Sequence, residues 1–445
     1  MSNKLIIWVI LGISLTTHFA FFGNPNQTVF DEVHFGKFIS GYYTHEYYFD
    51  IHPPLGKLMI AGFAKIFNFK PEFSFAQIGE KFPDNKYQAL RFLPSLAGAL
   101  LPVVIFLLAL QLKFTPKGAF MAGLLVAIEN ALIVQTHYIL MDGFLLLFGF
   151  LSLLFYFKSR SEILNTKYLI LASIFGGLTI SIKWTGLTFL ALPLIIETWS
   201  CLKNRSYERF IRQLFFFVTI PLVIYFSVFV VHFSLLTKPG TGDAFMKPTF
   251  HQDNIVTKFF QLNTEMYRSN QRLTATHSYS SQWLSWPFMA RPIFYWISQG
   301  EGSREAGIAS ENSRIYLIGN PIIWWASTAA ILFSIILLLS EKFKVKSLKL
   351  KERNILYILL GAYILNLLPF IGIKRVMFLY HYMTALVFAI LILVYLIERQ
   401  EHAKKIFIGL AVASAVAFIY FAPLTYGLPL SPKAYESRVW LSSWR

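Results

Sequence analysis

Five ionisable side chains crowd a short polar segment that follows the first apolar stretch of the chain. They are Asp31, Glu32, His34, Asp50 and His52. The chain has only 23 acidic residues in 445, so the grouping is unusual for this sequence. Adjacent carboxylates raise each other's proton affinity, which suits a general base. The competing interpretation is a solvated loop in which Asp31 caps a helix.

The composition is that of a protein embedded in a membrane. Hydrophobic residues make up 56% of the chain and charged residues only 14%, against roughly 25% charged residues in ordinary soluble domains. Apolar runs near the length that crosses a bilayer recur along the whole sequence. We therefore expect an all-α polytopic membrane protein, in which ionisable groups at the membrane surface are functional candidates. The single cysteine, Cys201, excludes an intramolecular disulfide.

Eleven apolar stretches qualify as membrane-spanning helices. The first lacks the small-residue cleavage site of a secretory signal, so we expect a retained helix. Two long polar segments remain between the spans, at 24–87 and 237–318. The expected spans are 4–23, 88–112, 118–136, 139–157, 168–182, 184–200, 213–235, 319–340, 354–372, 376–397 and 405–422.

The net charge of +17 is concentrated in alternate loops, which argues against nucleic-acid binding. The positive-inside rule makes those loops cytoplasmic. The N-terminus is then inside, and 24–87 and 237–318 lie outside, in an inner or plasma membrane. Trp and Tyr between His277 and Trp296 favour a helix lying in the membrane interface. The basic residues are Lys113, Lys117, Lys158, Arg160, Lys167, Lys203, Arg205, Arg209, Arg212, Lys342, Lys344, Lys346, Lys349, Lys351, Arg353, Arg399, Lys404 and Lys405.

Further polar residues fall at the outer ends of the expected spans, on the side of Asp31 and Glu32. Arginines at the headgroup level can bind phosphate through two hydrogen bonds, and a nearby carboxylate can serve as a base. The alternative for each arginine is snorkelling to phospholipid headgroups. For the others it is a helix cap, an interhelical hydrogen bond or interface packing. The residues are Arg91, Glu129, Asn130, Asp142, Lys183, Lys374, Arg375, His381 and Tyr382.

These motifs, taken in order, resemble the protein O-mannosyltransferases, membrane glycosyltransferases of the GT-C type. The resemblance runs through nearly the whole chain, and its pieces keep the family's order and face. They are Asp31-Glu-Val-His-Phe-Gly, Phe49-Asp-Ile-His-Pro-Pro-Leu-Gly-Lys57, Arg91, Glu129-Asn130 with Ile139-Leu-Met-Asp142, Ser181-Ile-Lys-Trp-Thr-Gly186, Gly319-Asn-Pro321 and Arg375-Val-Met-Phe-Leu-Tyr-His-Tyr382.

The resemblance implies inverting transfer of mannose from a polyprenyl-phosphate carrier to Ser or Thr of an exported protein. It implies that Asp31, the first acidic residue of the pair, is the catalytic one, and that Arg91 serves the carrier phosphate. We expect Asp31 to act as the base, with Glu32 as the rival. We expect Arg375 and His381 to assist Arg91, and His34, His52, Glu129, Asp142, Lys183 and Tyr382 to support the site. The segment 237–318 is too short for the β-trefoil (MIR) domain of the eukaryotic enzymes, which suggests the compact bacterial form.

Two other functions remain open at this point. A related GT-C enzyme could move another lipid-linked sugar onto a glycolipid or lipid A. A transporter is disfavoured because its site would lie near the bilayer midplane, often between repeats, whereas here the polar residues gather at one face. We expect no metal cofactor, although the acidic and histidine side chains of 31–52 could supply ligands to a divalent cation.

Overall fold

The computed structural model describes residues 2–161, 166–205, 207–272, 276–298, 312–339, 350–373 and 375–445. Lys374 and four of the predicted cytoplasmic lysines, at 342, 344, 346 and 349, lie outside the described residues. So do parts of the predicted outer segment 237–318, at 273–275 and 299–311.

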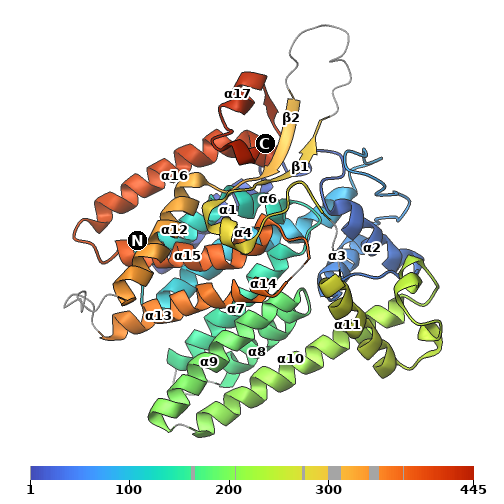
Figure 1. The fold of residues 1–445 in the computed structure, drawn as a ribbon, viewed down its shortest axis with the longest axis horizontal. Helices are drawn as coiled ribbons and strands as arrows, with labels where there is room; N and C mark the ends of the chain where they lie inside the picture. The colour runs from blue at the N-terminus through green and yellow to red at the C-terminus, as the bar shows by residue number, and fades with distance from the viewer. Residues whose placement is uncertain are drawn as a thin grey trace.

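Long apolar helices build most of the molecule (Figure 1). Within the described residues, eight helices are long and apolar enough to cross a membrane. They are Tyr87–Gln111 (α4), Asp142–Ser161 (α7), Trp184–Asn204 (η1, Trp184–Gly186, with α9, Leu187–Asn204), Tyr207–Leu235 (α10), Pro321–Leu339 (α12), Arg353–Ile371 (within α13, Leu350–Leu365, and α14, Leu368–Ile371), Leu379–Ile397 (η6, Leu379–Tyr382, with α15, Met383–Ile397) and Ala403–Tyr426 (α16).

Three further apolar elements complete the correspondence with the predicted spans. Helices α5 (Pro116–Ala127) and α6 (Asn130–His137) qualify together, with a 55° bend between them, and would make a ninth span. Helices α1 (Asn3–Phe19) and α8 (Thr166–Ile180) are apolar but shorter. The predicted multi-pass helical architecture is confirmed, and the count of eleven is approximate because two of its spans are short helices and a third is bent.

The bend within the third predicted span has a local cause. Helix α5 ends at Ala127, and Glu129 adopts an extended backbone as the N-cap of α6. Its carboxylate accepts a hydrogen bond from the backbone N–H of Leu132 at 2.8 Å. A carboxylate that caps a new helix start satisfies donors that would otherwise be orphaned. The sequence pattern shows the apolar run but not this interruption.

The core of the helical bundle is α15 (Met383–Ile397). Every residue from Met383 to Tyr395 is buried, which is why this stretch is apolar around its whole circumference. Helices α12, α13 and α5 pack against it. Helix α10, by contrast, is mostly exposed and runs along one margin of the molecule towards α11 (Figure 1). Such an exposed apolar surface is compatible with lipid contact.

The two polar segments fold into short helices and a small sheet. The first contains α2 (Glu32–Thr44) and α3 (Leu55–Ile66). The second contains 3-10 turns, the amphipathic helix α11 (Ile255–Arg272) and an antiparallel pair of strands, β1 (Ile293–Ile297) and β2 (Asn312–Leu317). The remaining elements are η2 (Thr241–Phe245), η3 (Phe250–Gln252), η4 (Trp283–Phe288), β3 (Pro429–Leu430), α17 (Pro432–Glu436) and η7 (Ser442–Trp444).

The expected interfacial helix between His277 and Trp296 is wrong in position. Only the short turn η4 forms there, and β1 follows it. Pro287 and Pro292 lack backbone N–H groups, and the aromatic and β-branched run after Pro292 favours a strand. Strand β2 lies between β1 and β3 in the sheet. The amphipathic helix of this region is instead α11, and the all-α class needs this small sheet added.

The orientation predicted from the basic loops can be tested at the two ends of α10. A reporter fused after Asn204 should lie on the cytoplasmic side, and one fused after Lys238 should lie on the outer side, because one membrane crossing separates them. Paired alkaline phosphatase and fluorescent-protein fusions read out both sides. The same side for both fusions would contradict the topology.

Candidate active site

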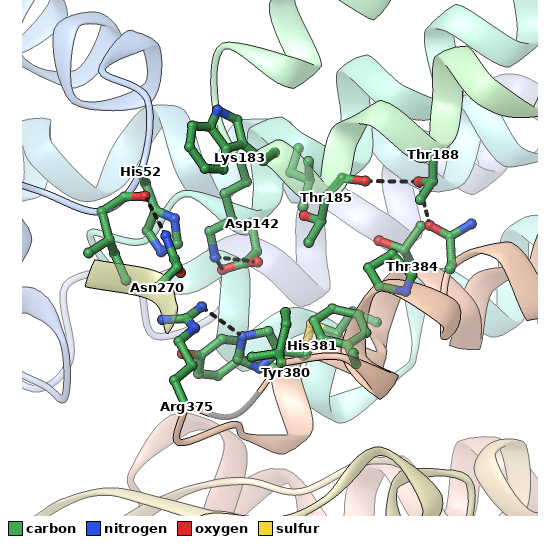
Figure 2. Close-up of a pocket in the computed structure, with 18 of the residues that line it drawn as sticks. His52, Asp142, Lys183, Thr185, Thr188, Asn270, Arg375, Tyr380, His381 and Thr384 are labelled. Atoms are coloured by element: carbon green, nitrogen blue, oxygen red, sulfur yellow. Dashed lines mark hydrogen bonds and ion pairs between the residues drawn. The ribbon is translucent and has the colours of Figure 1, made fainter. Parts of the chain in front are cut away.

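A cavity of about 220 Å³, lined in part by polar side chains, lies where the ends of several helices meet (Figure 2). Helix α7 begins there, η1 and α9 begin there, and the C-terminal turn of α11 closes one side. The segment leading from α14 (Leu368–Ile371) into η6 (Leu379–Tyr382) forms the opposite wall. The polar lining residues that Figure 2 labels are His52, Asp142, Lys183, Thr185, Thr188, Asn270, Arg375, Tyr380, His381 and Thr384.

A buried ion pair occupies the centre of this cavity wall. The Lys183 amine donates to both carboxylate oxygens of Asp142, at 2.8 and 2.9 Å. Asp142 is the first residue of α7, and Lys183 lies in extended backbone between α8 and η1. The Gln135 side chain donates to the same carboxylate at 2.7 Å. Asp142 therefore holds Lys183 at the cavity wall while compensating part of its charge.

Arg375 is the cation of the cavity that lacks an acidic partner. None of the carboxylates in the described residues forms an ion pair with it, and its Nε is buried without a hydrogen-bond partner among them. One guanidinium nitrogen, Nη2, lies 3.5 Å from Nε2 of His381. The His381 ring stacks on Tyr380 and on Trp286, with ring centroids 4.4 and 5.7 Å apart. A half-buried guanidinium with unused donors is suited to bind an anion.

Asp31 lies immediately before α2, but its side chain does not cap the helix. Burial raises the pKa of the Asp31 carboxyl from 3.8 to about 7. Lys183 and Arg375 lower that pKa, and Asp142 and Asp50 raise it. Asp31 is therefore within electrostatic range of the cavity's charged groups. A carboxylate with a pKa near neutrality is matched to general-base work at physiological pH.

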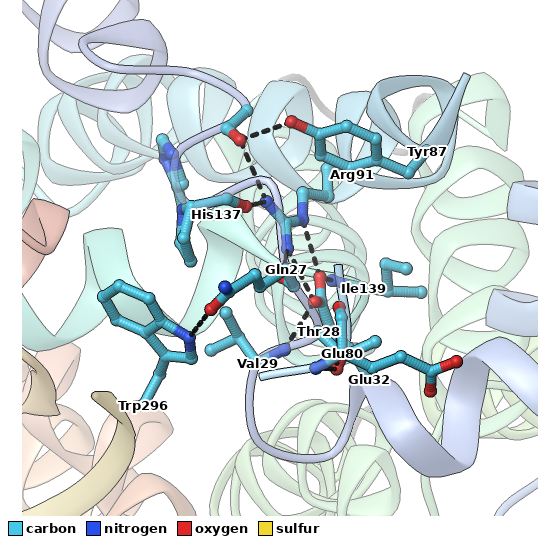
Figure 3. A network of polar contacts seen from close by, with 12 residues as sticks. Gln27, Thr28, Val29, Glu32, Glu80, Tyr87, Arg91, His137, Ile139 and Trp296 are labelled. Atoms are coloured by element: carbon cyan, nitrogen blue, oxygen red, sulfur yellow. Dashed lines mark hydrogen bonds and ion pairs between the residues drawn. The ribbon is translucent and has the colours of Figure 1, made fainter. Parts of the chain in front are cut away.

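Glu32 and Arg91 form a completely buried pair outside the cavity (Figure 3). Arg91 donates from Nε and Nη2 to the two carboxylate oxygens of Glu32, each at 2.7 Å. Backbone N–H groups of Val29 and Ile139 also donate to that carboxylate. The remaining Arg91 donors bind the backbone carbonyl oxygens of Gly23, Pro25 and Gln27.

This geometry disagrees with the roles expected for Glu32 and Arg91 from the sequence. Both side chains are fully shielded from solvent. Glu32 accepts four hydrogen bonds and has no access to an acceptor hydroxyl. Arg91 has its donors engaged by protein oxygens, so it neither snorkels nor faces a phosphate at the headgroup level. Adjacent residues at a helix start point in different directions, so Asp31 and Glu32 need not share a site.

The other predicted site residues separate into two groups. His52, Asp142, Lys183, Arg375 and His381 line the cavity, as Figure 2 shows. Burial lowers the pKa of His52 well below its ordinary value, and the charges of Lys183 and Arg375 add to that effect. His52 is therefore neutral at physiological pH and can act as a hydrogen-bonding group.

Three supporting residues lie elsewhere. His34 is exposed on α2. Glu129 caps α6 and accepts a hydrogen bond from the Asn320 backbone at 2.7 Å. Tyr382 is buried with its hydroxyl 3.2 Å from that of Tyr363. These positions give His34, Glu129 and Tyr382 no contact with the cavity.

Helix α11 contributes cavity residues that the sequence reasoning missed. Tyr267, Asn270 and Gln271 line the cavity from its last turns. Hydrogen bonds through α10 tie this helix to η1: the Trp184 indole donates to the Tyr225 hydroxyl at 2.8 Å, which donates to Asn263 of α11 at 2.5 Å. The amphipathic pattern of 255–272 could have identified this helix from the sequence. The interfacial helix was instead assigned to the aromatic run between His277 and Trp296.

The acidic and histidine side chains of residues 31–52 were the candidate ligands for a divalent cation. Within the ranges that the structure describes, no three His, Cys, Asp or Glu side chains are grouped so that they could hold a metal ion. Asp50, one of the candidate ligands, pairs with the Lys57 amine.

The arrangement of helices is that of the GT-C membrane glycosyltransferases. The yeast (S. cerevisiae) protein O-mannosyltransferase Pmt1-Pmt2 complex bound to the sugar donor superposes with a TM-score of 0.91 at 20% identity, covering 100% of this chain and 93% of that chain. ArnT from Cupriavidus metallidurans bound to undecaprenyl phosphate gives a TM-score of 0.55 at 13% identity, covering 94% of this chain and 64% of that chain. At these identities the likeness establishes the fold.

The family follows from the sequence comparisons. A family model described as dolichyl-phosphate-mannose-protein mannosyltransferase matches residues 8–237, and one described as the C-terminal four TMM region of protein-O-mannosyltransferase matches residues 255–444. The chain belongs to the protein O-mannosyltransferase family, as the motifs predicted.

Curated relatives are longer proteins. Protein O-mannosyltransferase 1 of Drosophila melanogaster is 32% identical over 260 residues, which is 55% of this chain and 29% of the relative. Dolichyl-phosphate-mannose--protein mannosyltransferase 4 of Candida albicans is 32% identical over 258 residues, 54% of this chain and 34% of the relative. The matched segment thus spans about a third of these relatives' length.

The buried Glu32–Arg91 pair should dominate stability in this region. Glu32→Gln and Arg91→Ala should each destabilise the protein by about 3–5 kcal/mol, because each leaves an unpaired charge in the interior. Thermal unfolding in detergent measures the effect, with Glu72→Gln, whose carboxylate is exposed, as the matched control. The double replacement Glu32→Leu with Arg91→Met should recover part of the loss. Unchanged midpoints in both single variants would contradict a structural role.

Proposed function

We propose that this protein transfers mannose from a polyprenyl-phosphate carrier to Ser or Thr hydroxyls of exported proteins, at the outer face of the membrane and with inversion at the anomeric carbon. The observation that carries the proposal is a cavity lined by Arg375, which has no acidic partner among the described residues, and by Lys183. Both cations act electrostatically on Asp31, a carboxyl of near-neutral pKa that does not itself line the cavity. The family supports the reaction, because its members are named for dolichyl-phosphate-mannose as donor and protein as acceptor.

Arg375 is the proposed main ligand of the carrier phosphate. It enters the cavity with unused donors, whereas Lys183 shares its charge with Asp142. A leaving phosphate gains negative charge as the glycosidic bond breaks, so cations that bind it strengthen their hold in the transition state. His381, beside Arg375, and Lys183 complete this anion site. The role first expected for Arg91 thus passes to Arg375 and Lys183.

Asp31 is the proposed general base. The acceptor hydroxyl attacks the anomeric carbon, the bond from that carbon to the phosphate oxygen breaks, and polyprenyl phosphate leaves with the bonding electrons. The hydroxyl proton passes to the Asp31 carboxylate. A single displacement of this kind inverts the configuration at the sugar carbon. Lys183 and Arg375 favour the ionised form of this carboxylate, because they lower the pKa that its burial raises.

Glu32 and Arg91 are positioning residues in this scheme. Together they fasten the backbone of residues 23–29 to α4 and to Ile139. Asp31 lies just after this anchored segment and immediately before Glu32. The pair therefore fixes the position of the Asp31 backbone, from which its carboxylate extends. The alternative, transfer of another lipid-linked sugar to a glycolipid or lipid A, is less well supported because both family models describe protein mannosylation.

The pH dependence of turnover should identify the base. Asp31 must be ionised to accept a proton, and its pKa is raised to about 7. Activity should therefore rise as the pH increases through about 7 and be lost below it. Asp31→Asn should lower turnover by about 10²–10⁴-fold and abolish that limb. Radiolabelled polyprenyl-phosphate-mannose with a Ser/Thr-containing peptide provides the assay.

The comparison that decides between neighbours is Asp31→Asn beside Glu32→Gln, each with its folded fraction measured. Glu32→Gln should lose activity in proportion to lost folded protein and keep the pH limb in what remains. Near-normal turnover in Asp31→Asn, with a folded but inactive Glu32→Gln, would assign the base to Glu32.

The donor site should respond most strongly at Arg375. Arg375→Ala should raise the KM for the carrier-linked sugar and lower kcat, because the lost hydrogen bonds strengthen as charge develops on the phosphate. Arg375→Lys should rescue only part, since an ammonium cannot bind two oxygens in a fork. Arg445→Ala, at an exposed arginine, is the control. Unchanged kinetics in Arg375→Ala would exclude it from the donor site.

A further inference from the structure

A second and larger cavity lies at the opposite end of the helical bundle. Its volume is about 1,090 Å³, and the inner halves of α7, α9 and α13 (Leu350–Leu365) form its walls, with the end of α4. The side chains that line the walls are largely apolar. The apolar lining residues include Leu192, Ile195, Trp199, Ile358 and Leu365. Nothing in the proposed transfer reaction uses this space.

The rim of the cavity is positively charged. Lys113, Arg160 and Lys203 line it, from the ends of α4, α7 and α9. Arg160 pairs with Glu197 at 3.2 Å, and Arg209 pairs with the same carboxylate at 3.1 Å. One carboxylate thus faces two arginines.

The two lysines at this rim add to the excess of positive charge. Neither Lys113 nor Lys203 forms an ion pair with another described residue. An apolar cleft with such a rim is complementary to an anionic amphiphile, because the walls can take acyl chains and the rim a phosphate.

A glycine keeps part of this cleft open. Gly361 lies inside α13 and lines the cavity, and a Cβ added there would meet no atom within 4 Å. Glycine in a helix interior is unfavourable by about 1 kcal/mol relative to alanine, and the open space shows that no close neighbour requires it here. A large side chain at this position would extend into the cleft.

The phosphate of the carrier that reacts at the catalytic cavity cannot also occupy this rim. Helix α9 runs from Leu187 at the catalytic cavity to Asn204 at the rim, and its 18 residues span about 27 Å at 1.5 Å per residue. A phosphate bound at Lys203 would lie that far from Lys183. The occupant therefore carries a phosphate of its own and comes from the leaflet on the basic side of the protein.

We propose that the cleft between α7, α9 and α13 binds an anionic phospholipid, with its phosphate at Lys113 and Lys203 and its acyl chains along α9 and α13. At their other ends these two helices are joined at the catalytic cavity, where the Thr188 hydroxyl donates to the Asn366 side chain at 2.7 Å. A lipid that bridges the inner ends would steady the same helix pair from the opposite side. Binding would then stabilise the protein without touching the reacting groups.

The experiment uses the purified full chain in detergent with added dioleoyl-phosphatidylglycerol or dioleoyl-phosphatidylcholine. Native mass spectrometry counts bound lipid, and thermal unfolding reports stabilisation. Phosphatidylglycerol should bind and raise the Tm of the unaltered protein, and phosphatidylcholine should do so far less. Lys113→Gln with Lys203→Gln should weaken phosphatidylglycerol binding by about 30-fold, because each lysine near an anionic headgroup contributes about 1 kcal/mol.

Two variants separate the cleft from general attraction to the basic face. Gly361→Phe should abolish the phosphatidylglycerol response by filling the cleft. Gly409→Phe is its control, because Gly409 also has open space around it but lies on α16, away from the cleft. Lys404→Gln with Lys405→Gln is the charge control. An equal response in Gly361→Phe and Gly409→Phe would overturn the proposal, as would equal binding of the two lipids.

Polyprenyl phosphate serves as a competitor in the same measurement. No displacement of phosphatidylglycerol is expected. Stabilisation by polyprenyl phosphate that Gly361→Phe abolishes, with no response to phosphatidylglycerol, would assign the cleft to the carrier's hydrocarbon tail and overturn the proposal.

Discussion

The buried pair of Glu32 and Arg91 is the interaction on which the segment between α1 and α2, and the start of α2, depend. Two charges removed from solvent must each find partners, and an unpaired one would be strongly destabilising. Here the partners are backbone groups from residues 23–29 and from Ile139, in addition to the two side chains themselves. The path of the chain between α1 and α2 is fixed by this requirement, and the start of α2 with it.

Asp31 and Glu32 illustrate how adjacent residues with the same chemistry acquire different roles. Successive helical residues are rotated by about 100°, so when Glu32 turns towards Arg91, Asp31 turns elsewhere. Glu32 is fully compensated, whereas Asp31 has a raised pKa through burial. The first can serve only to hold the chain in place, and the second retains the capacity to take a proton. The anchoring residue and the proposed base are thus one peptide bond apart.

Sequence reasoning succeeded where it relied on the length of the apolar stretches and on the polar residues at their ends. Each predicted span overlaps an apolar helix, and His52, Asp142, Lys183, Arg375 and His381 do converge on one cavity. The length of a membrane-spanning stretch and the distribution of charge around it depend on local sequence alone, so both can be read without a structure.

The failures came from properties that depend on tertiary partners. Whether Arg91 faces a phosphate or a carboxylate is decided by where residues 23–32 fold back, which no spacing encodes. The bend at Glu129 likewise follows from a cap, not from a loss of hydrophobicity. Helix α11 was overlooked because only its tertiary setting brings Asn270 beside Arg375 (Figure 2).

The position of α11 gives the cavity an unusual kind of wall. One side of the helix supplies Asn270 to the cavity. Val256 and Phe260 are exposed apolar side chains, and an amphipathic helix at a membrane surface buries such side chains among the acyl chains near the headgroups. The Tyr225 hydroxyl links this helix through hydrogen bonds to Trp184, next to Lys183. The depth of such a helix in the membrane would change with the hydrocarbon thickness of the surrounding bilayer. The dimensions of the cavity would then be set jointly by the protein and by the lengths of the lipid tails around it.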